Sequence, residues 1–122
     1  MISIPCHFGN YAQGRKSPVR FLVIHYTANN GDTARGNGNY FARSKVNASA
    51  HYFVDENECV QSVQEKDTAW HCGANVYKHP ECRNANSIGI ELCSRKDSAG
   101  RYYFKDATVK NAAALARQLM QK

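Results

Sequence analysis

The run Val19-Arg20-Phe21-Leu22-Val23-Ile24-His25 decides the fold class of this 122-residue sequence. It is almost continuously apolar and rich in β-branched residues, a pattern that is typical of a buried central strand. The run Ser87-Ile88-Gly89-Ile90-Glu91-Leu92 has the same character and predicts a second buried strand. We therefore expect a sheet with other elements packed on it.

The segments around these runs predict further strands and a first helix. Ala50–Val54 and Cys59–Val63 flank the turn-forming residues Asp55–Glu58, which predicts a β-hairpin with a four-residue loop. Thr33 is placed to cap a helix that runs through Tyr40–Ala42, although two glycines weaken that helix.

The clearest helical periodicity lies near the end of the sequence. Asp106 or Thr108 is the expected N-cap. Its predicted apolar face consists of Val109, Ala112, Ala113, Ala116, Leu119 and Met120. Strands early and in the middle, with helices near both ends, predict a mixed α/β fold in which helices pack on a sheet. Neither an internal repeat nor a linker divides the sequence, so residues 1–122 are expected to form a single domain.

Composition restricts the classes of partner. Sixteen basic and ten acidic side chains give a formal net charge of +6, and 43% of the residues are apolar. This favours a globular protein with an anionic partner, either nucleic acid or a charged polymer such as bacterial wall. The basic residues are dispersed without interleaved aromatics, which makes nucleic acid the weaker interpretation. No apolar run approaches the roughly 20 residues that cross a bilayer, and no secretory signal is visible, so we expect cytoplasmic synthesis and no membrane insertion.

The five cysteines leave two interpretations open. Their spacing includes no C-x-x-C, which excludes a zinc ribbon and a thioredoxin-like motif. Cys72 and Cys82 bracket a short loop and would form a local bridge if the protein works outside the cell. Buried or idle thiols are the favoured alternative.

The residues best suited to chemistry lie on or at the ends of the predicted strands. His25 ends an apolar strand, where an imidazole can bind zinc, act as a base or simply be hydrogen-bonded. Glu91 lies within an apolar strand, and burial there would raise its pKa and suit it to general acid–base work. The alternative is that Glu91 points outward from an edge strand, which alternates in polarity more than this run does.

Trp70 and His71 form a second group of interest. Trp70 offers a flat apolar face for a sugar or peptide, and the alternative is a core anchor. His71 offers a polar tip beside it. His51 either serves the site or hydrogen-bonds within the hairpin, and the second is favoured, whereas His7 and His79 are expected at the surface.

Four blocks of the sequence resemble a known family when they are read in order. They are FLVIHYTA at 21–28, SAHYFV at 49–54, AWHCG at 69–73 and NSIGIEL at 86–92. Together they resemble the type 2 N-acetylmuramoyl-L-alanine amidases, which are zinc amidases related to peptidoglycan recognition proteins. The resemblance runs from about Arg20 to the end of the chain. It implies a central mixed β-sheet flanked by helices, a zinc-bearing groove, and hydrolysis of the amide between N-acetylmuramic acid and the L-alanine of the stem peptide.

The resemblance also assigns roles to individual residues. It implies that His25 is a zinc ligand and that Glu91 is the general base. It places Trp70 and His71 in the substrate groove, with Thr27 beside the ligand strand. Ala50 stands where the phage lysozyme-like branch has a tyrosine, so the glutamate-dependent branch fits better.

The remaining zinc ligands of the family are expected beyond Lys122, so the resemblance implies an amidase domain that lacks its C-terminal part. The alternatives are an inactive peptidoglycan-binding module, or a site completed by another chain or by His71 or Cys93. Incomplete cover of the last helix predicts self-association. The absence of a visible signal peptide suits a protein that, like an endolysin, acts on the wall after release.

Overall fold

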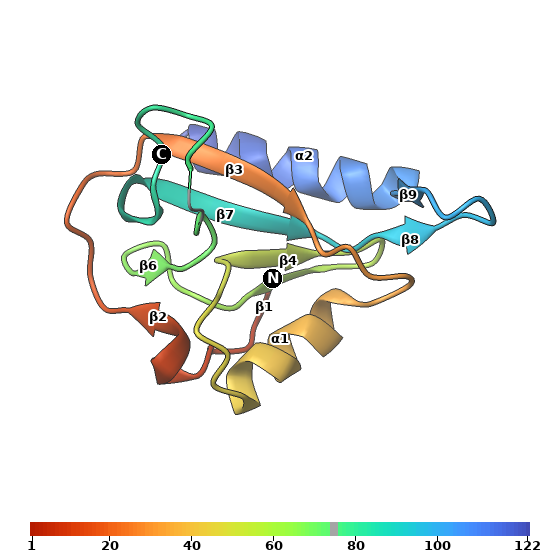
Figure 1. The fold of residues 1–122 in the computed structure, drawn as a ribbon, viewed down its shortest axis with the longest axis horizontal. Coiled ribbons are helices and arrows are strands. Elements are labelled where there is room, and N and C mark those ends of the chain that lie inside the picture. The colour runs from red at the N-terminus through yellow and green to blue at the C-terminus, as the bar shows by residue number, and fades with distance from the viewer. Residues whose placement is uncertain (74–75) are drawn as a thin grey trace.

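A five-stranded sheet forms the centre of the structure, a computed structural model that describes residues 1–73 and 76–122 (Figure 1). Its strand order is β1-β5-β4-β7-β3. Strands β3, β7 and β4 run parallel, β5 is antiparallel to β4, and β1 is parallel to β5. The strands span Ile2–Ser3 (β1), Phe21–Tyr26 (β3), Tyr52–Val54 (β4), Cys59–Gln61 (β5) and Ser87–Leu92 (β7). The sheet is therefore mixed, as the resemblance implied.

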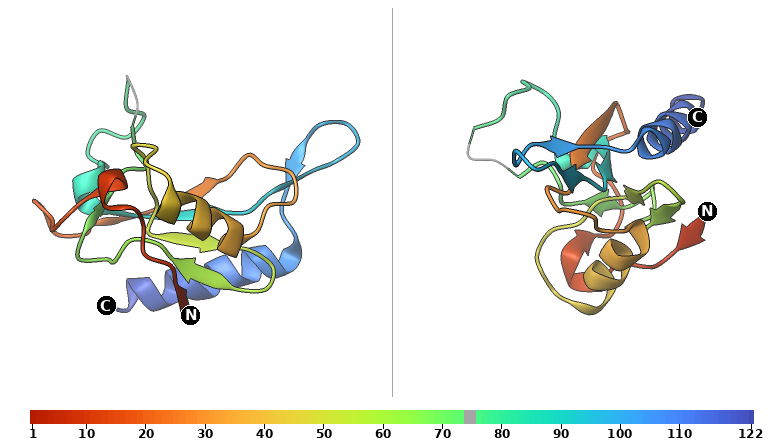
Figure 2. Two further views of the ribbon diagram at one scale, coloured as in Figure 1. Left: turned by 90° about the horizontal axis from the view of Figure 1, so that it is seen from below. Right: turned by 90° about the vertical axis from the view of Figure 1, so that its right-hand side faces the viewer.

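Two helices cover opposite faces of this sheet, which the two further views make plain (Figure 2). Helix α1 spans Ala34–Arg43 and packs against β4 and β5, whereas α2 spans Asp106–Met120 and packs against β7 and β4. The core beneath α2 includes Tyr52, Val54, Ile88, Ile90, Leu92, Ala112, Leu115 and Leu119. The core beneath α1 consists of Ala34, Ala50, Phe53 and Val60. The predicted fold class, a sheet flanked by helices, is confirmed.

Shorter elements complete the described part of the chain. Strand β2 (Tyr11–Ala12) pairs with β6 (Thr68–Ala69), and β8 (Arg95–Lys96) forms a hairpin with β9 (Tyr102–Tyr103). Two 3₁₀ turns span Phe8–Asn10 and Asn84–Asn86. Within the described residues, neither helix has the length and apolar character needed to cross a membrane.

Several local predictions are confirmed. The Thr33 hydroxyl caps α1 by accepting a hydrogen bond from the Gly36 N–H at 3.0 Å. Strands β4 and β5 form the predicted hairpin around Asp55, whose carboxylate accepts from the Asn57 and Glu58 amides and stabilises the turn.

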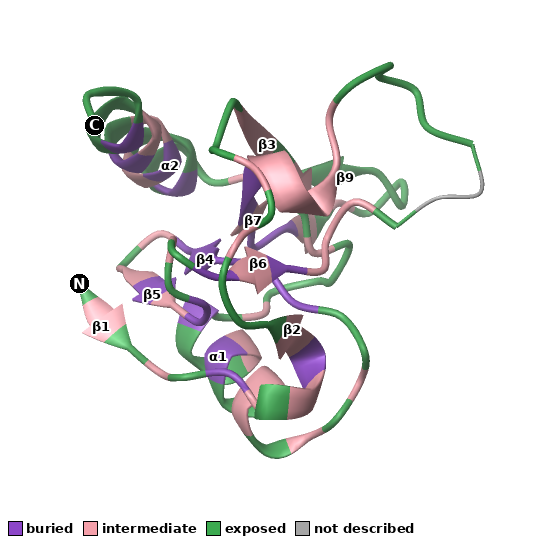
Figure 3. Cartoon of the chain, turned by 90° about the vertical axis from the view of Figure 1, so that its left-hand side faces the viewer, coloured by how far each residue is buried: buried purple, intermediate pink, exposed green. Residues whose placement is uncertain are grey.

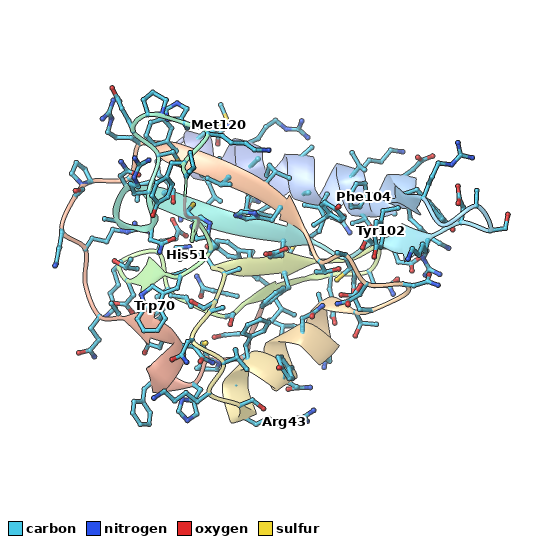
Figure 4. All side chains as sticks on the ribbon, in the orientation of Figure 1. Arg43, His51, Trp70, Tyr102, Phe104 and Met120 are labelled. Atoms are coloured by element: carbon cyan, nitrogen blue, oxygen red, sulfur yellow. The ribbon has the colours of Figure 1, made fainter. Side chains whose placement is uncertain are left out.

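The prediction that the first apolar run forms a central strand is wrong. Strand β3 lies at the edge of the sheet, and Ile24 and Tyr26 are 54% and 49% exposed. The physical reason is that α2 packs over β7 and β4, so it leaves the same face of β3 partly open (Figure 3). The ring of Tyr26 contacts those of Tyr102 and Phe104, which lie together beyond the end of β3, but it stays half exposed (Figure 4).

The details predicted for the last helix are partly wrong. Lys105 precedes the helix as its N-cap without a side-chain hydrogen bond, and Asp106 is the first helical residue. The buried face consists of Thr108, Ala112, Leu115 and Leu119. Val109 and Met120 are 48% and 73% exposed because the helix turns these positions away from the sheet. Self-association of the chain stays a prediction.

Asn10 joins the N-terminal segment to the end of α1. It is fully buried, and its amide donates to the carbonyls of Phe41 (3.0 Å) and Ser44 (2.8 Å). Its oxygen accepts from the amides of Val46 (2.7 Å) and Asn47 (3.1 Å). One side chain thus fixes the course of the chain as it leaves α1.

Replacing Asn10 by alanine is expected to lower the free energy of unfolding by about 3 kcal/mol, because buried donors and acceptors would lose their partners. Denaturant unfolding measures the change. The matched control is Asn57→Ala in the exposed hairpin loop, where we expect a change within about 0.5 kcal/mol. Equal stability of the two variants would contradict the role assigned to Asn10.

Candidate metal and catalytic site

The register of the parallel strands brings the chemical residues into one row. His25 of β3 lies opposite Glu91 of β7, and Phe53 of β4 lies opposite Glu91 on the other side. Paired residues of neighbouring strands point to the same face of a sheet. Phe53 belongs to the core beneath α1, so His25 and Glu91 are on the α1 face.

Glu91 has the environment of a general acid or base. Burial and, to a smaller extent, the nearby charge of Asp32 together raise the pKa of its carboxyl to about 7. Among the described residues, its buried Oε1 atom has no hydrogen-bond partner. A buried acceptor without a partner is costly to the fold, and together with the raised pKa it makes Glu91 a candidate for acid–base chemistry.

A group of three metal-binding side chains lies next to Glu91. His25 Nε2 is 2.9 Å from His71 Nδ1, and the Cys72 Sγ atom is 3.2 Å from the same Nδ1. The ring nitrogen of His25, that of His71 and the sulfur of Cys72 all lie within 4.8 Å of one another. Burial lowers the pKa of both His25 and His71, the latter to about 3, with the charges of neighbouring histidines adding to the shift of His71. Both rings are therefore neutral near pH 7, the form that binds metals.

Gly89 allows His71 to approach the sheet. A Cβ atom at this position would lie 2.6 Å from Cγ of the His71 ring, closer than real contacts allow. The ring of His71 therefore rests directly on the backbone of β7, two residues before Glu91.

Gly89→Ala is expected to displace His71 and to lower the free energy of unfolding by about 2 kcal/mol, because an added methyl in a packed site forces neighbours to shift. Thermal or denaturant unfolding measures this, and the histidine resonances in NMR spectra report the displaced ring. Gly73→Ala is the control, since a Cβ there would meet nothing within 4 Å. An unchanged His71 resonance in Gly89→Ala would contradict the proposed contact.

Two cavities meet at Glu91. One has a volume of about 470 Å³ and the other about 410 Å³, and both are lined by Phe41, Phe53 and Glu91. The first also includes Trp70 and His71, and the second includes Thr27. Because Glu91 lines both cavities, a long substrate that occupied them would place a bond from its middle next to this carboxylate.

Trp70 is half-buried and lies along the groove, with its backbone held by two hydrogen bonds to Ser49. His51 lies nearby in the interior (Figure 4). Its Nδ1 accepts from the Gly89 amide, so its Nε2–H donates to the Asp67 carbonyl, and the Arg15 guanidinium lies 3.2 Å from the same Nε2. Burial lowers the pKa of this ring to about 4. His51 thus has a structural role, although its partners lie outside the hairpin where they were expected.

The structure brings all five predicted site residues together: His25, Thr27, Trp70, His71 and Glu91. Their roles stay predictions. All five cysteines are free thiols, so a Cys72–Cys82 bridge is not formed in this structure. Cys93, considered as a substitute ligand, is buried and contacts Asn37 rather than His25.

Sequence reasoning missed three supporting residues. Asn84 accepts hydrogen bonds from the backbone amides of His71 and Cys72 at 3.0 and 2.7 Å. Ser87 lies 3.1 Å from His71 Nε2. Cys72 was considered only for a disulfide, although its position directly after His71 could have suggested a ligand pair.

The fold and the site together define an α/β domain with a half-buried carboxylate in a groove beside a cluster of side chains that could bind a metal. Comparison with known families agrees. The family model described as N-acetylmuramoyl-L-alanine amidase matches residues 15–122. The chain belongs to this family.

Individual relatives support the assignment. N-acetylmuramoyl-L-alanine amidase CwlL of Bacillus licheniformis is 34% identical over 115 residues, which cover 85% of this chain and 30% of that protein. AmiD of Escherichia coli is 30% identical over 124 residues, which cover 91% of this chain and 43% of that protein. A solved structure of a mutant endolysin from Bacillus subtilis superposes with a TM-score of 0.77 at 27% identity, with coverages of 98% and 74%. The chain thus spans less than half the length of these two curated relatives.

Proposed function

We propose that this chain contributes to the hydrolysis of the amide bond between N-acetylmuramic acid and the L-alanine of the stem peptide in peptidoglycan. The observation that carries the proposal is the position of Glu91, which lies beside His25 in the sheet where two cavities meet. Family membership supports the reaction class, and relatives named as amidases support the bond that is cleaved.

The residues present fit a zinc ion. His25 offers a neutral ring nitrogen next to further nitrogen and sulfur donors, the types of ligand that Zn²⁺ prefers. Among the described residues, the buried Oε1 of Glu91 has no hydrogen-bond partner, so it is available to accept a hydrogen bond from a molecule bound in the groove. When bound, Zn²⁺ would polarise the scissile carbonyl and activate a water molecule.

Glu91 would move the proton in this reaction. With a pKa near 7, its carboxylate can take a proton from the attacking water and return it to the leaving amine of L-alanine. A general base works best when its pKa is close to the working pH, which burial in the groove provides.

The groove residues would position the substrate. Trp70 offers an apolar face against which the sugar ring can pack, and Thr27 lies in the second cavity on the other side of Glu91. The net charge of +6 favours contact with an anionic wall. We expect the sugar and the peptide to occupy the two cavities, with the scissile amide at Glu91.

The test uses purified peptidoglycan and the full chain. We expect new L-alanine amino termini to appear, to disappear after chelation, and to return when Zn²⁺ is added. Wall binding in a sedimentation assay without any released amine would contradict hydrolysis and favour a wall-binding module. Salt-sensitive binding to DNA or RNA without wall binding would favour the nucleic-acid alternative.

Release to the wall, in the manner of an endolysin, is part of the proposal and is supported by the solved endolysin with the same fold. The family's further ligands, which the resemblance places beyond Lys122, stay a prediction.

A further inference from the structure

We infer that the groove continues past Trp70 into a third cavity, which binds a second N-acetylated sugar of the substrate chain. The inference rests on the proposed function, because it names the part of the substrate that lies next to the sugar whose peptide is cleaved. It makes glycan chains of two or more sugars, rather than single muramoyl peptides, the preferred substrate class.

The three cavities follow one another in a row. The cavities of about 470 and 410 Å³ meet at Phe41, Phe53 and Glu91. The third cavity, called the distal cavity below, has a volume of about 400 Å³ and shares Trp70 and Asn84 with the 470 Å³ cavity. Each is large enough for a small ligand. A chain that extends from Glu91 past Trp70 would therefore enter the distal cavity.

Trp70 separates the distal cavity from the rest of the groove. It directly follows β6, at the end of the molecule where β2 lies (Figure 4). Its backbone is held by two hydrogen bonds to Ser49, and its half-buried side chain lines both cavities. A flat apolar ring at this position can pack against one sugar on each side of the boundary.

Asn84 presents a free donor at the same boundary. Its side-chain oxygen accepts from the amides of His71 and Cys72 at 3.0 and 2.7 Å. Two N–H donors require an oxygen, so the orientation of the side-chain amide is fixed. Among the described residues, Nδ2 has no hydrogen-bond partner and is not buried. It can therefore donate to the hydroxyl or acetamido oxygen of a sugar that lies beside Trp70.

The walls of the distal cavity are tied together before any ligand binds. The guanidinium of Arg15 donates to the carbonyls of Ala85 (3.2 Å) and Ser87 (3.1 Å), which joins the segment after β2 to β7. The Thr68 hydroxyl donates to the Gly14 carbonyl at 2.7 Å. Walls that are already ordered lose little entropy on binding, so weak contacts with a sugar can contribute to affinity.

The side chains that line the distal cavity suit a neutral sugar. None of the described ones is acidic, and the charge of Arg15 faces backbone carbonyls. Lys16 is exposed at the edge of the cavity. An aromatic ring with amide donors is a typical surface for a ligand of hydroxyl and acetamido groups. A peptide carboxylate, in contrast, would depend on Lys16.

The test measures binding without hydrolysis. Oligomers of N-acetylglucosamine with one to four sugars are added to the full chain, and the fluorescence of Trp70, its single tryptophan, reports binding. These probes contain no peptide, so no amide at a stem peptide can be cleaved. We expect the affinity to rise about tenfold or more from one sugar to three, since a further aromatic contact and a hydrogen bond are gained.

One pair of variants tests the donor of Asn84. Asn84→Asp keeps the oxygen that accepts from the two backbone amides and removes the Nδ2 donor. We expect about fivefold weaker binding of the trisaccharide. The control is Asn30→Asp, which makes the same change at an exposed side chain whose oxygen accepts from the Lys96 amide. Its affinity should be that of wild type.

A second pair of variants blocks the distal cavity. Ala12 is exposed and lines this cavity but not the 470 Å³ cavity, so Ala12→Leu fills space without disturbing the core. We expect the gain in affinity from one sugar to three to disappear. Ala99→Leu, at an exposed position in the β8–β9 turn, should keep the gain. Circular dichroism confirms that each variant is folded.

Two results would overturn the inference: equal wild-type affinity for one sugar and three, or an undiminished gain in Ala12→Leu. A sugar-free stem peptide that changed Trp70 fluorescence, and bound less tightly to Lys16→Gln, would instead assign the distal cavity to peptide. Hydrolysis of wall without any dependence on sugar number would remove this inference and leave the proposed function intact. Length-dependent sugar binding without hydrolysis would do the reverse.

Discussion

Replacing Glu91 by glutamine is expected to reduce the release of L-alanine amino termini from purified wall by a factor of about 10² to 10⁴, the usual contribution of a general base. Glutamine keeps the size and hydrogen-bonding shape of the side chain but cannot accept the proton of water. Zinc content, measured by competition with a chelator, should stay within about twofold of wild type because Glu91 is not among the proposed ligands.

The same substitution is expected to stabilise the metal-stripped protein above neutral pH. The pKa of Glu91 is raised from 4.5 to about 7 in the folded state, mainly by burial. Between these values the folded state holds a proton that the unfolded state releases, so wild-type stability falls as the pH rises through this window. Glutamine has no such dependence. Its advantage should be small below about pH 4.5 and reach about 3 kcal/mol above pH 7.

Glu81→Gln provides the matched control, because it makes the same chemical change at an exposed side chain paired with Arg20. Wall hydrolysis and the pH profile of unfolding should both remain those of wild type. Full hydrolysis by Glu91→Gln, or a stability difference that does not vary with pH, would show that the role assigned to this carboxylate is wrong.

His25→Ala is expected to lose both the metal and the reaction. Removing the ring takes away a nitrogen ligand and the partner of His71 Nδ1. We expect Zn²⁺ affinity to fall at least 100-fold, since losing an outer-shell partner alone costs about 10-fold to 100-fold. Hydrolysis should fall below detection, because the activated water and the polarised carbonyl both depend on the metal.

His7→Ala is the control for this prediction, because it removes the ring of a half-buried histidine that caps the first 3₁₀ turn in the N-terminal segment. Both variants are compared by metal competition, wall hydrolysis and unfolding. Together with Glu91→Gln, they separate binding of the metal from use of the proton. A His25→Ala protein that still bound Zn²⁺ as tightly as wild type would rule out the ring as a ligand.

Much of the fold could be predicted because local patterns determine it. The hairpin around Asp55, the helix capped by Thr33 and the buried strand that carries Glu91 follow from turn chemistry, capping and apolar runs. The position of β3 at the edge of the sheet could not be predicted, since an apolar run does not reveal which neighbours cover it. Ile24, for example, belongs to the apolar run but is more than half exposed.

The candidate site could be predicted in its residues but not in its connections. His25 and Glu91 stand out because each combines a reactive side chain with an apolar strand. That they are register partners depends on pairing between strands 66 positions apart, which no local pattern encodes. The link from Ser87 to His71 depends in the same way on the path of the chain between them.

The row formed by Phe53, Glu91 and His25 makes the site an indicator of correct strand pairing. A slip of one residue between β3 and β7 would turn His25 toward the α2 side and leave Glu91 without its neighbour. Such a chain could retain helices and a compact core yet would be entirely inert. In a refolded preparation, the specific activity would therefore be proportional to the fraction of molecules with the correct strand register. Helix content measured by spectroscopy would not separate these molecules from the misaligned ones.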